Sequence, residues 1–526
     1  MSVRRVMGTE TEYAVSAPGQ GRYNPVQLSF DVVGAASDAS RSHIRWDYRQ
    51  EDPVNDARGT RLERAAAHPD LLTDAPQLNI TNVIAPNGGR IYVDHAHPEY
   101  SAPETTDPFE AVRYDRAGDL IMRAAAAKAS ETTGRKIVLH RNNVDGKEPA
   151  GHARKLHDAA VGTVRPGDTP HDHALRLPTD LHRLRPRRIG EHSENAGYQL
   201  SQRADYFHMK VGLQTTFDRP IINTRDESHS TDEYRRLHVI VGDANRMDVP
   251  QALKLGTTSM LLWLLEHADM AEIDLNEALE PLTLADPVEA MHTVSHDLTL
   301  AAPLPLETGG TTTAWQMQVT LRGLVYAAAA TVYGTDTSGE PAWPDRSTRN
   351  IMAMWGQALA DVATVRHADD DGRLTMREQA SRLEWLLKWQ LLEKLRRKTG
   401  SDWTDRRLAA VDLKWAALDP ADSIFTRLAG QTERLVTDKQ LAEAVGQAPA
   451  DTRAWLRAEI VRRFPEQVVA ASWSHLTVRG ESSGDENVEN SMVSLDMSNP
   501  LKFTESLCSE AFERVHTASG IVESLR

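Results

Sequence analysis

The chain contains one cysteine, Cys508, among 526 residues, so an intrachain disulfide is excluded and a reducing compartment is expected. Long hydrophobic runs are also lacking. The longest apolar stretch, around residues 260–265, is far shorter than the ~20 residues that a membrane-spanning helix needs. The N-terminal segment MSVRRVMGTETEYAV turns acidic before an apolar run develops, which argues against a signal peptide. These absences predict a cytoplasmic protein.

Basic residues are outnumbered by acidic ones. Lys and Arg total 60 and Asp and Glu total 75, which gives a net charge of -15. This balance argues against generic binding to nucleic acid or to an anionic membrane surface. Hydrophobic residues make up 40% and charged residues 26% of the chain, as is typical of a soluble globular protein.

Hydrophobic periodicity predicts an α+β fold with a small C-terminal appendage. Residues 79–84 and 89–94 are predicted to form a hairpin around a turn at 86–89. Other strands are expected at 4–16, at 136–142, within 197–223 as parts of one antiparallel sheet, and at 467–478. Helical spacing occurs at 106–130, 249–268, 286–299, 312–333, 350–365, 377–396 and 451–464. A loop is expected at 480–490.

The first candidate site is the segment Gly8-Thr9-Glu10-Thr11-Glu12. On a strand, Glu10 and Glu12 project from the same face. Two neighbouring carboxylates repel each other unless a cation lies between them, and Mg²⁺ prefers such hard oxygen ligands. The competing interpretation is a solvated strand face.

The second candidate site follows the predicted turn. Arg90, Tyr92 and Asp94 share one strand face, and Asp94 is the candidate general base or nucleophile. The alternative for Asp94 is a strand-end carboxylate in a surface ion pair. His95 and His97 suggest a zinc site of the H-x-H type, although simple packing or hydrogen bonding explains them as well.

A third group of polar residues contains several arginines that could clamp phosphates or a carboxylate. They are Arg203, Arg225, Arg235 and Arg236, with His238 in the same segment as the last two. Any one of these arginines alone is more often part of a surface ion pair, and it is the presence of four beside predicted strand ends that favours a site.

Eight segments in order resemble the Pup ligase/depupylase family, which has a glutamine-synthetase-like carboxylate-amine ligase fold. They are RRVMGTETEY, RIYVDHAHPEYSAPE, NNVDGK, QLSQRADY, PIINTRDE, YRRLHVIVGDAN, LKLGTTS and QVVAASW. RWDYRQEDPVNDARG, residues 45–59, resembles part of a loop that depupylases carry before the catalytic Asp, here expected at about 37–85. The resemblance therefore favours the depupylase branch.

The resemblance implies a curved antiparallel sheet packed on helices, forming a bowl that holds ATP or ADP with Mg²⁺. The implied metal ligands are Glu10, Tyr92 and Glu99, with Glu12 beside them. The nucleotide contacts are expected from Arg90 and Trp473, and from Arg203, Arg225 and His238. The implied domains are a catalytic domain at 1–445 and a small C-terminal domain at 446–526.

The resemblance also implies the reaction and the partners. Asp94 would activate water, or itself attack, at the Gln side-chain amide of Pup or at a Pup–lysine isopeptide bond. The products would be Pup ending in Glu and, from pupylated proteins, free lysine, with a functional link to the proteasome. The alternatives are a Pup ligase, a catalytically impaired Pup-binding homologue, and a zinc amidase that uses His95 and His97.

The resemblance is interrupted at about residues 148–188, which are rich in His, Arg and Pro. The family has a G-T-H-E-N-Y block here, expected near the metal–nucleotide site. Residues 151–160, GHARKLHDAA, can be encoded by GGG CAC GCA CGA AAA CTA CAT GAT GCG GCG. Reading these bases one position later gives G-T-H-E-N-Y-M-M-R. The hypothesis is a frame-shifted stretch, and the alternative is a divergent surface insertion.

Overall fold

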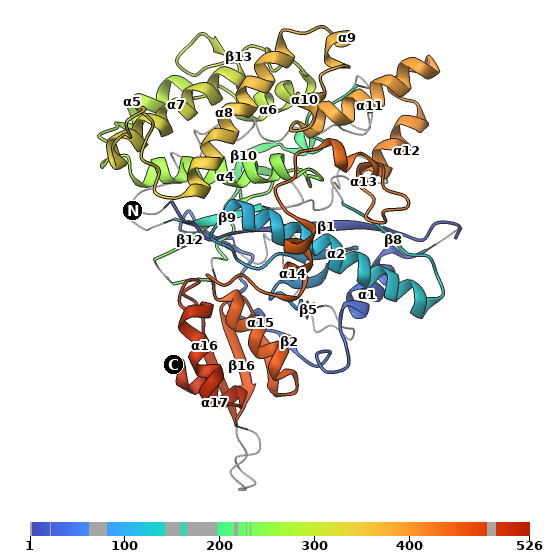
Figure 1. Cartoon of the computed structure of the whole chain (residues 1–526), viewed down its shortest axis with the longest axis vertical. Helices are drawn as coiled ribbons and strands as arrows, with labels where there is room; N and C mark the ends of the chain where they lie inside the picture. The colour runs from blue at the N-terminus through green and yellow to red at the C-terminus, as the bar shows by residue number, and fades with distance from the viewer. Residues whose placement is uncertain are drawn as a thin grey trace.

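The computed structural model describes residues 3–20, 23–62, 82–141, 159–164, 197–214, 219–227, 229–231, 233–480 and 491–526. A nine-stranded sheet crosses the middle of the molecule, with helices above it and a smaller unit below it (Figure 1). Its strand order is β10 (Met209–Gly212), β11 (Pro220–Asn223), β12 (Arg235–Val239), β9 (Ala159–Val164), β1 (Met7–Ser16), β7 (His97–Ser101), β6 (Arg90–Asp94), β5 (Asn82–Ile84), with β8 (Val138–Arg141) paired to β1.

The central strand β1 uses its two faces differently. Thr9 and Thr11 donate hydrogen bonds to Asp115 on helix α2 (Pro108–Thr133), at 3.3 and 3.1 Å. Because side chains alternate along a strand, Glu10 and Glu12 project from the opposite face. Helix α2 therefore covers one face of β1 and leaves the acidic face for the site.

The sheet is mostly antiparallel, and the predicted hairpin at 79–94 is confirmed as the β5–β6 pair. One prediction is wrong: β10 and β11 pair in parallel, and residues 197–208 contain the short helix η3 (Ala204–Tyr206) in place of a strand. Alternation predicts that a segment is a strand, but it carries no information on the direction of the neighbouring strand.

Helices make up the upper half of the molecule in Figure 1. They are α4 (Asp248–Glu266), α5 (Leu275–Leu279), α6 (Pro287–His296), α7 (Ala314–Tyr333), α8 (Arg346–Arg366), α9 (Asp370–Arg373), α10 (Arg377–Ala380), α11 (Glu384–Thr399), α12 (Arg406–Trp415) and α13 (Ile424–Leu428). Trp263, Trp355 and Trp385 are among the fully buried side chains of this half. None of the helices among the described residues is long and apolar enough to cross a membrane.

The single helix predicted at 377–396 is wrong, because α10 and α11 are separate. Helix α11 starts at Glu384, which is buried. Its carboxylate accepts hydrogen bonds from the backbone amides of Arg246 and Met247 and from the indole of Trp415. These tertiary contacts fix where α11 begins and override the helical periodicity.

The smaller unit contains α15 (Ala454–Arg463), α16 (Glu505–Arg514), α17 (Ala518–Ser524) and a four-stranded sheet. Its strand order is β17 (Met492–Asp496), β16 (His475–Arg479), β15 (Val468–Ala471) and β2 (Arg45–Trp46). The single strand predicted at 467–478 is therefore wrong. Ser472 makes the reversal, because its hydroxyl accepts from the amides of Ser474 and His475.

Further elements complete the molecule: α1 (Pro25–Ala36), β3 (Asn55–Asp56), β4 (Thr60–Arg61), β13 (Leu304–Pro305), β14 (Thr311–Thr312) and α14 (Asp438–Gly446). The mixed architecture with a largely antiparallel sheet confirms the predicted α+β class. The domain boundary near residue 446 stays a prediction. The predicted loop at 480–490, apart from Gly480, and much of the loop at 37–85 lie outside the described residues.

Candidate functional site

The register of β1, β7 and β6 arranges the predicted site residues in two rows across three strands. Directly opposite residues of antiparallel strands share a face of the sheet. The first row is Glu12, Glu99 and Tyr92, and the second row is Glu10, Ser101 and Arg90. The structure therefore brings together on one face residues that the sequence placed in two separate motifs.

Three carboxylates gather at the end of the first row. One oxygen from each of Glu12, Asp94 and Glu99 lies within 4.8 Å of the other two, and Glu12 and Glu99 are buried. Like charges this close disfavour one another's ionisation unless a cation lies between them. This donor set of hard oxygen atoms fits Mg²⁺.

Tyr92 adds a phenol beside these carboxylates. Its hydroxyl donates to Glu99 Oε1 at 2.6 Å. Burial, followed by the charges of Glu99 and Glu10, raises the pKa of Tyr92 well above its ordinary value. Tyr92 therefore stays protonated at neutral pH and acts as a hydrogen-bond donor to Glu99.

The turn between β6 and β7 positions Asp94. His95 has a left-handed backbone, with φ of 54°, and its Nδ1 lies 2.7 Å from Asp94 Oδ1. Ser29 of α1 donates to the carbonyl oxygen of Ala96 at 2.7 Å, which ties the turn to a helix. His97 Nδ1 lies 3.5 Å from Glu12 Oε2.

The two histidines therefore contact different carboxylates. Among the described residues, the group of three that could hold a metal consists of carboxylates and includes no histidine. This donor chemistry favours a hard cation over the zinc site considered for His95 and His97.

Arg90 is held from several sides. Its guanidinium lies 4.1 Å from the ring centres of both Trp46 and Tyr92. Its Nε donates to Asn82 Oδ1 at 2.8 Å, and its Nη1 lies 3.3 Å from Glu51 Oε1. Residues 45–51, which belong to the depupylase-like loop segment, thus reach the central sheet.

A second charged cluster adjoins Glu10. Arg225 and Arg236 each lie 3.7 Å from Glu227, and Arg236 Nη2 lies 3.2 Å from His238 Nδ1. Burial alone would raise the pKa of Glu227, but the two guanidinium groups hold it below its ordinary value. His238 Nε2 is 4.0 Å from Glu10 Oε2, so this cluster continues into the acidic face.

A pocket of about 110 Å³ joins Glu10 to the smaller unit. Its charged and aromatic lining residues are Glu10, Glu104, His229, Arg236, Arg453 and Trp473. Trp473 makes an edge-to-face contact with Trp46, with ring centres 5.3 Å apart. An aromatic ring and two guanidinium groups thus lie next to the acidic face.

Arg203, unlike Arg225 and Arg236, is not part of the charged cluster beside Glu10. It is almost completely buried, where its Nη1 donates to the carbonyl oxygen of Gly242 at 3.2 Å and its guanidinium packs near Phe207. Arg235 donates to the carbonyl oxygen of Tyr234. The structure therefore joins Arg225 and Arg236 to the site, whereas Arg203 contacts Gly242, just after β12, and Phe207, just before β10.

Sequence reasoning missed the ion pairs that attach the smaller unit. Glu104 pairs with Arg453 and Arg457, and Arg457 Nε also donates to the carbonyl oxygen of Gly88 at 2.9 Å. The two arginines lie four residues apart, Arg453 as the N-cap of α15 and Arg457 in its first turn, and this spacing was the only local signal. Glu104 ends the segment RIYVDHAHPEYSAPE, but no sequence pattern linked it to Arg453, which lies 349 residues further along the chain.

Comparisons with known proteins agree over nearly the whole chain. The family model described as Pup-ligase protein matches residues 5–153 and 182–477. The Pup deamidase/depupylase of Mycolicibacterium smegmatis is 38% identical, covering 99% of this chain and 100% of that protein. The depupylase of Acidothermus cellulolyticus is 36% identical with 99% coverage of both, and a Pup–protein ligase of Corynebacterium jeikeium is 31% identical over 77% of this chain and 85% of that protein.

Two solved structures have the same fold. The Pup ligase PafA in complex with Pup gives a TM-score of 0.73 at 24% identity, covering 99% of this chain and 91% of that one. PafA in complex with ADP gives 0.65 at 26% identity, covering 82% and 90%. The family match leaves residues 154–181 uncovered, inside the stretch where the resemblance is interrupted. The chain belongs to the Pup ligase/depupylase family.

Proposed function

We propose that this chain is a nucleotide-dependent hydrolase that cleaves Pup–lysine isopeptide bonds and converts the C-terminal Gln of Pup to Glu. The observation that carries the proposal is the carboxylate group Glu12–Asp94–Glu99 beside a pocket that contains Trp473. The relatives named depupylase, matched along their full length, support hydrolysis over ligation. ADP-bound PafA supports a nucleotide, ATP or ADP.

We propose that different residues at and around the acidic face bind the metal ion and the nucleotide. Glu10, Glu12, Glu99 and Tyr92 would hold Mg²⁺, which supplies positive charge next to the nucleotide phosphates. Arg90, Trp473, Arg225 and His238 would contact the nucleotide. We assign no such role to Arg203, because its contacts lie elsewhere.

Asp94 is the proposed catalytic residue. As a general base, its carboxylate takes a proton from water while the water oxygen attacks the amide carbon of the Gln side chain or of the isopeptide bond. As a nucleophile, the carboxylate oxygen attacks that carbon itself and water releases the acyl group afterwards. In both cases the C–N bond breaks and ammonia or the lysine amine leaves. The leaving nitrogen takes its proton from Asp94 when Asp94 is the general base, and from solvent when Asp94 is the nucleophile.

The cellular setting is also part of the proposal. Pup and pupylated proteins are the partners, which links the chain to protein degradation by the proteasome. A single cysteine and an acidic net charge support a cytoplasmic location without nucleic-acid partners.

The test is incubation of the purified protein with a pupylated substrate, with and without ATP and Mg²⁺, beside Asp94→Asn. We expect release of Pup that requires nucleotide and is lost in the variant. Formation of new conjugates from Pup and free lysine side chains would establish the ligase instead. Binding of Pup without release would establish a catalytically impaired homologue.

A further inference from the structure

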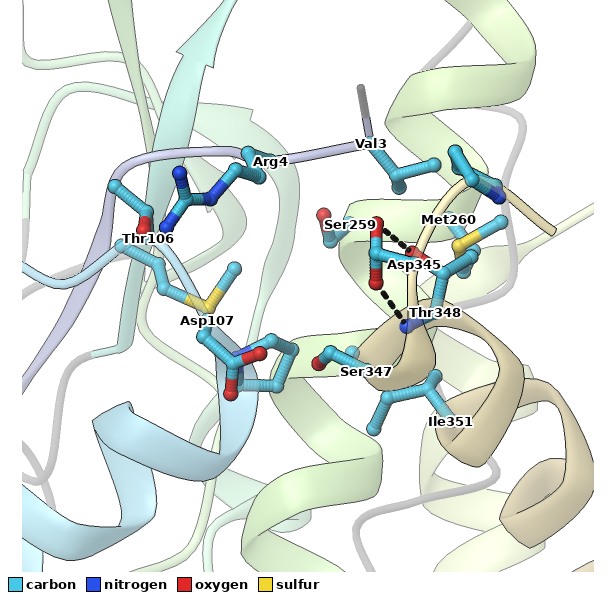
Figure 2. Close-up of a pocket in the computed structure, with 14 residues that line it drawn as sticks. Val3, Arg4, Thr106, Asp107, Ser259, Met260, Asp345, Ser347, Thr348 and Ile351 are labelled. Carbon is cyan, nitrogen blue, oxygen red and sulfur yellow. Dashed lines mark hydrogen bonds between the residues drawn. The ribbon is translucent and has the colours of Figure 1, made fainter. Parts of the chain in front are cut away.

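A second and larger cavity lies outside the acidic face. It has a volume of about 580 Å³, within the usual range of small-molecule sites. Its walls come from the N-terminal segment and from the starts of α2 and α8, and α4 contributes Gly256, Ser259 and Met260 (Figure 2). Met7 lines both this cavity and the pocket beside Glu10.

The packing of α4 against α8 shapes this cavity. A Cβ atom added at Gly256 would lie 2.5 Å from Ile351 Cδ1, so the two helices approach closely only because this residue is glycine. Ile351 and Met260 then contribute apolar surface to the wall. The close packing of α4 on α8 therefore sets the shape of this wall.

Two carboxylates face the cavity from different walls. Asp107 is the N-cap of α2, where its Oδ1 accepts from the amides of Phe109 and Glu110. Asp345 is the N-cap of α8 and accepts from the amide and the hydroxyl of Thr348. An ionised carboxylate has about four acceptor positions, so each Asp keeps capacity for a further donor.

Hydroxyl groups add to the polar lining. Thr106 is 5% exposed, and neither its hydroxyl nor that of Ser347 has a hydrogen-bond partner among the described residues. Both residues line the cavity, and Figure 2 shows them beside Asp107 and Asp345. A buried hydroxyl without a partner costs free energy, which a ligand that donates a hydrogen bond would recover.

The charge balance around the cavity is negative. Among the described lining residues Arg4 is the only basic one, and its guanidinium is paired with Asp451. Burial, followed by the charges of Asp107 and Asp451, raises the pKa of the neighbouring Glu110. The carboxylates in this region therefore repel additional negative charge and favour a cation.

We propose that this cavity binds an aliphatic ammonium ion, with its charged ends at Asp107 and Asp345 and its carbon chain against Met260 and Ile351. Two carboxylates with apolar surface between them match a diamine, and among the described residues neither belongs to a group of three side chains close enough to share a metal ion. The inference is independent of the hydrolase activity proposed above. The same chemistry is offered by a free polyamine and by a lysine side chain of a polypeptide.

Calorimetric titration of the full chain with 1,5-diaminopentane tests the proposal. We expect saturable binding, no binding of the uncharged isostere 1,5-pentanediol, and no binding of inorganic phosphate. Tighter binding of an acetylated, amidated lysine peptide than of the diamine would identify a lysine side chain as the occupant, and the reverse order a free polyamine.

Asp107→Asn and Asp345→Asn separate charge from fold, because Asn is as good an N-cap as Asp. Each is expected to weaken binding of the diamine about tenfold or more, whereas Asp286→Asn at the N-cap of α6 should leave it unchanged. Ser347→Leu keeps both charges but places a bulkier apolar side chain in the cavity wall and should also weaken binding. Absence of diamine binding, equal binding of the diol, or binding that survives both Asn variants would overturn the proposal.

Discussion

His95 Nδ1 lies 2.7 Å from Asp94 Oδ1, and the ring reaches this position because His95 adopts a left-handed backbone at φ 54°. The hydrogen bond from Ser29 to Ala96 holds the same turn against α1. One oxygen of the Asp94 carboxylate is thereby oriented by a fixed neighbour. His95 Nε2 is buried without a partner among the residues that the structure describes.

His95→Ala is expected to lower kcat for Pup release about 100-fold with little change in KM, because Asp94 loses its orienting contact. His95→Asn should recover part of that loss, since Asn tolerates positive φ and its amide can donate to the carboxylate. Steady-state kinetics on a pupylated substrate measure both variants. Equal kcat in His95→Ala and the unmodified chain would contradict the positioning role.

Glu12→Gln is expected to weaken Mg²⁺ binding about tenfold or more, because a charged oxygen ligand becomes neutral. The same change should raise the melting temperature in EDTA, since it removes repulsion among Glu12, Asp94 and Glu99. Calorimetry with MgCl₂ and ADP and thermal melts measure the two effects. Glu289→Gln, whose side chain is 72% exposed, is the control and should change neither. Unchanged Mg²⁺ affinity in Glu12→Gln would place the metal elsewhere.

Glu104→Gln is expected to lower the free energy of unfolding by about 3 kcal/mol, because Arg453 and Arg457 lose the carboxylate that they share. Glu378→Gln, at a pair whose Glu is 75% exposed, should cost no more than about 0.5 kcal/mol. Urea unfolding of the two variants gives the comparison. Similar losses would show that burial adds nothing to the Glu104 ion pairs.

The Glu104 ion pairs also predict a pH dependence. Burial alone would raise the pKa of Glu104, but Arg457 and Arg453 lower it from 4.5 to about 2. Because the folded pKa lies below the unfolded one, this stabilisation is complete above the unfolded pKa and is lost as pH falls toward the folded pKa. The difference in stability between the unmodified chain and Glu104→Gln should therefore shrink as the pH falls from about 5 to about 2. A constant difference would contradict the assignment.

Gly88→Ala is expected to destabilise the docking of α15. Gly88 has φ of 83°, and an added Cβ would lie 2.7 Å from the carbonyl oxygen of Ala454. Gly339 has φ of 84° with nothing within 4 Å, so Gly339→Ala reports the backbone strain alone, about 1 kcal/mol. Urea unfolding should show a loss in Gly88→Ala larger by about 1–3 kcal/mol. Equal losses of unfolding free energy in the two variants would mean that α15 moves away from the added Cβ atom without destabilising the protein.

The sequence predicted the parts of the site that lie within one hairpin or strand. Alternation correctly grouped Glu10 with Glu12 on one side of their strand, and Arg90 with Tyr92 and Asp94 on one side of theirs. Alternation within a strand has no information on register between strands, however. The pairing of Glu12 with Glu99 and of Glu99 with Tyr92, which completes the carboxylate group, therefore had to come from the structure or from resemblance.

Two further features were not predicted from the sequence: the ion pairs of Glu104, and the reversal at Ser472 that divides the strand predicted at 467–478. Glu104 meets Arg453 and Arg457 only because α15 docks on the central sheet, and local sequence patterns contain no sign of that docking. The reversal at Ser472 contains no glycine or proline, so the usual turn signals were absent and β15 and β16 were predicted as one strand.

The stretch at about 148–188 leads to a prediction about the gene. The family match stops at residue 153 and resumes at 182, and of this stretch the structure describes only β9, between β1 and β12. If the frame is shifted by a sequencing error, mass spectrometry of the trypsin-digested native protein will find a peptide that contains G-T-H-E-N-Y-M-M-R. Resequencing will then reveal one uninterrupted frame through that block.

Unambiguous reads that encode GHARKLHDAA, with matching peptides, would contradict the sequencing-error explanation. Nucleotide-dependent Pup release by a protein with that verified sequence would further show that the reaction tolerates loss of the block.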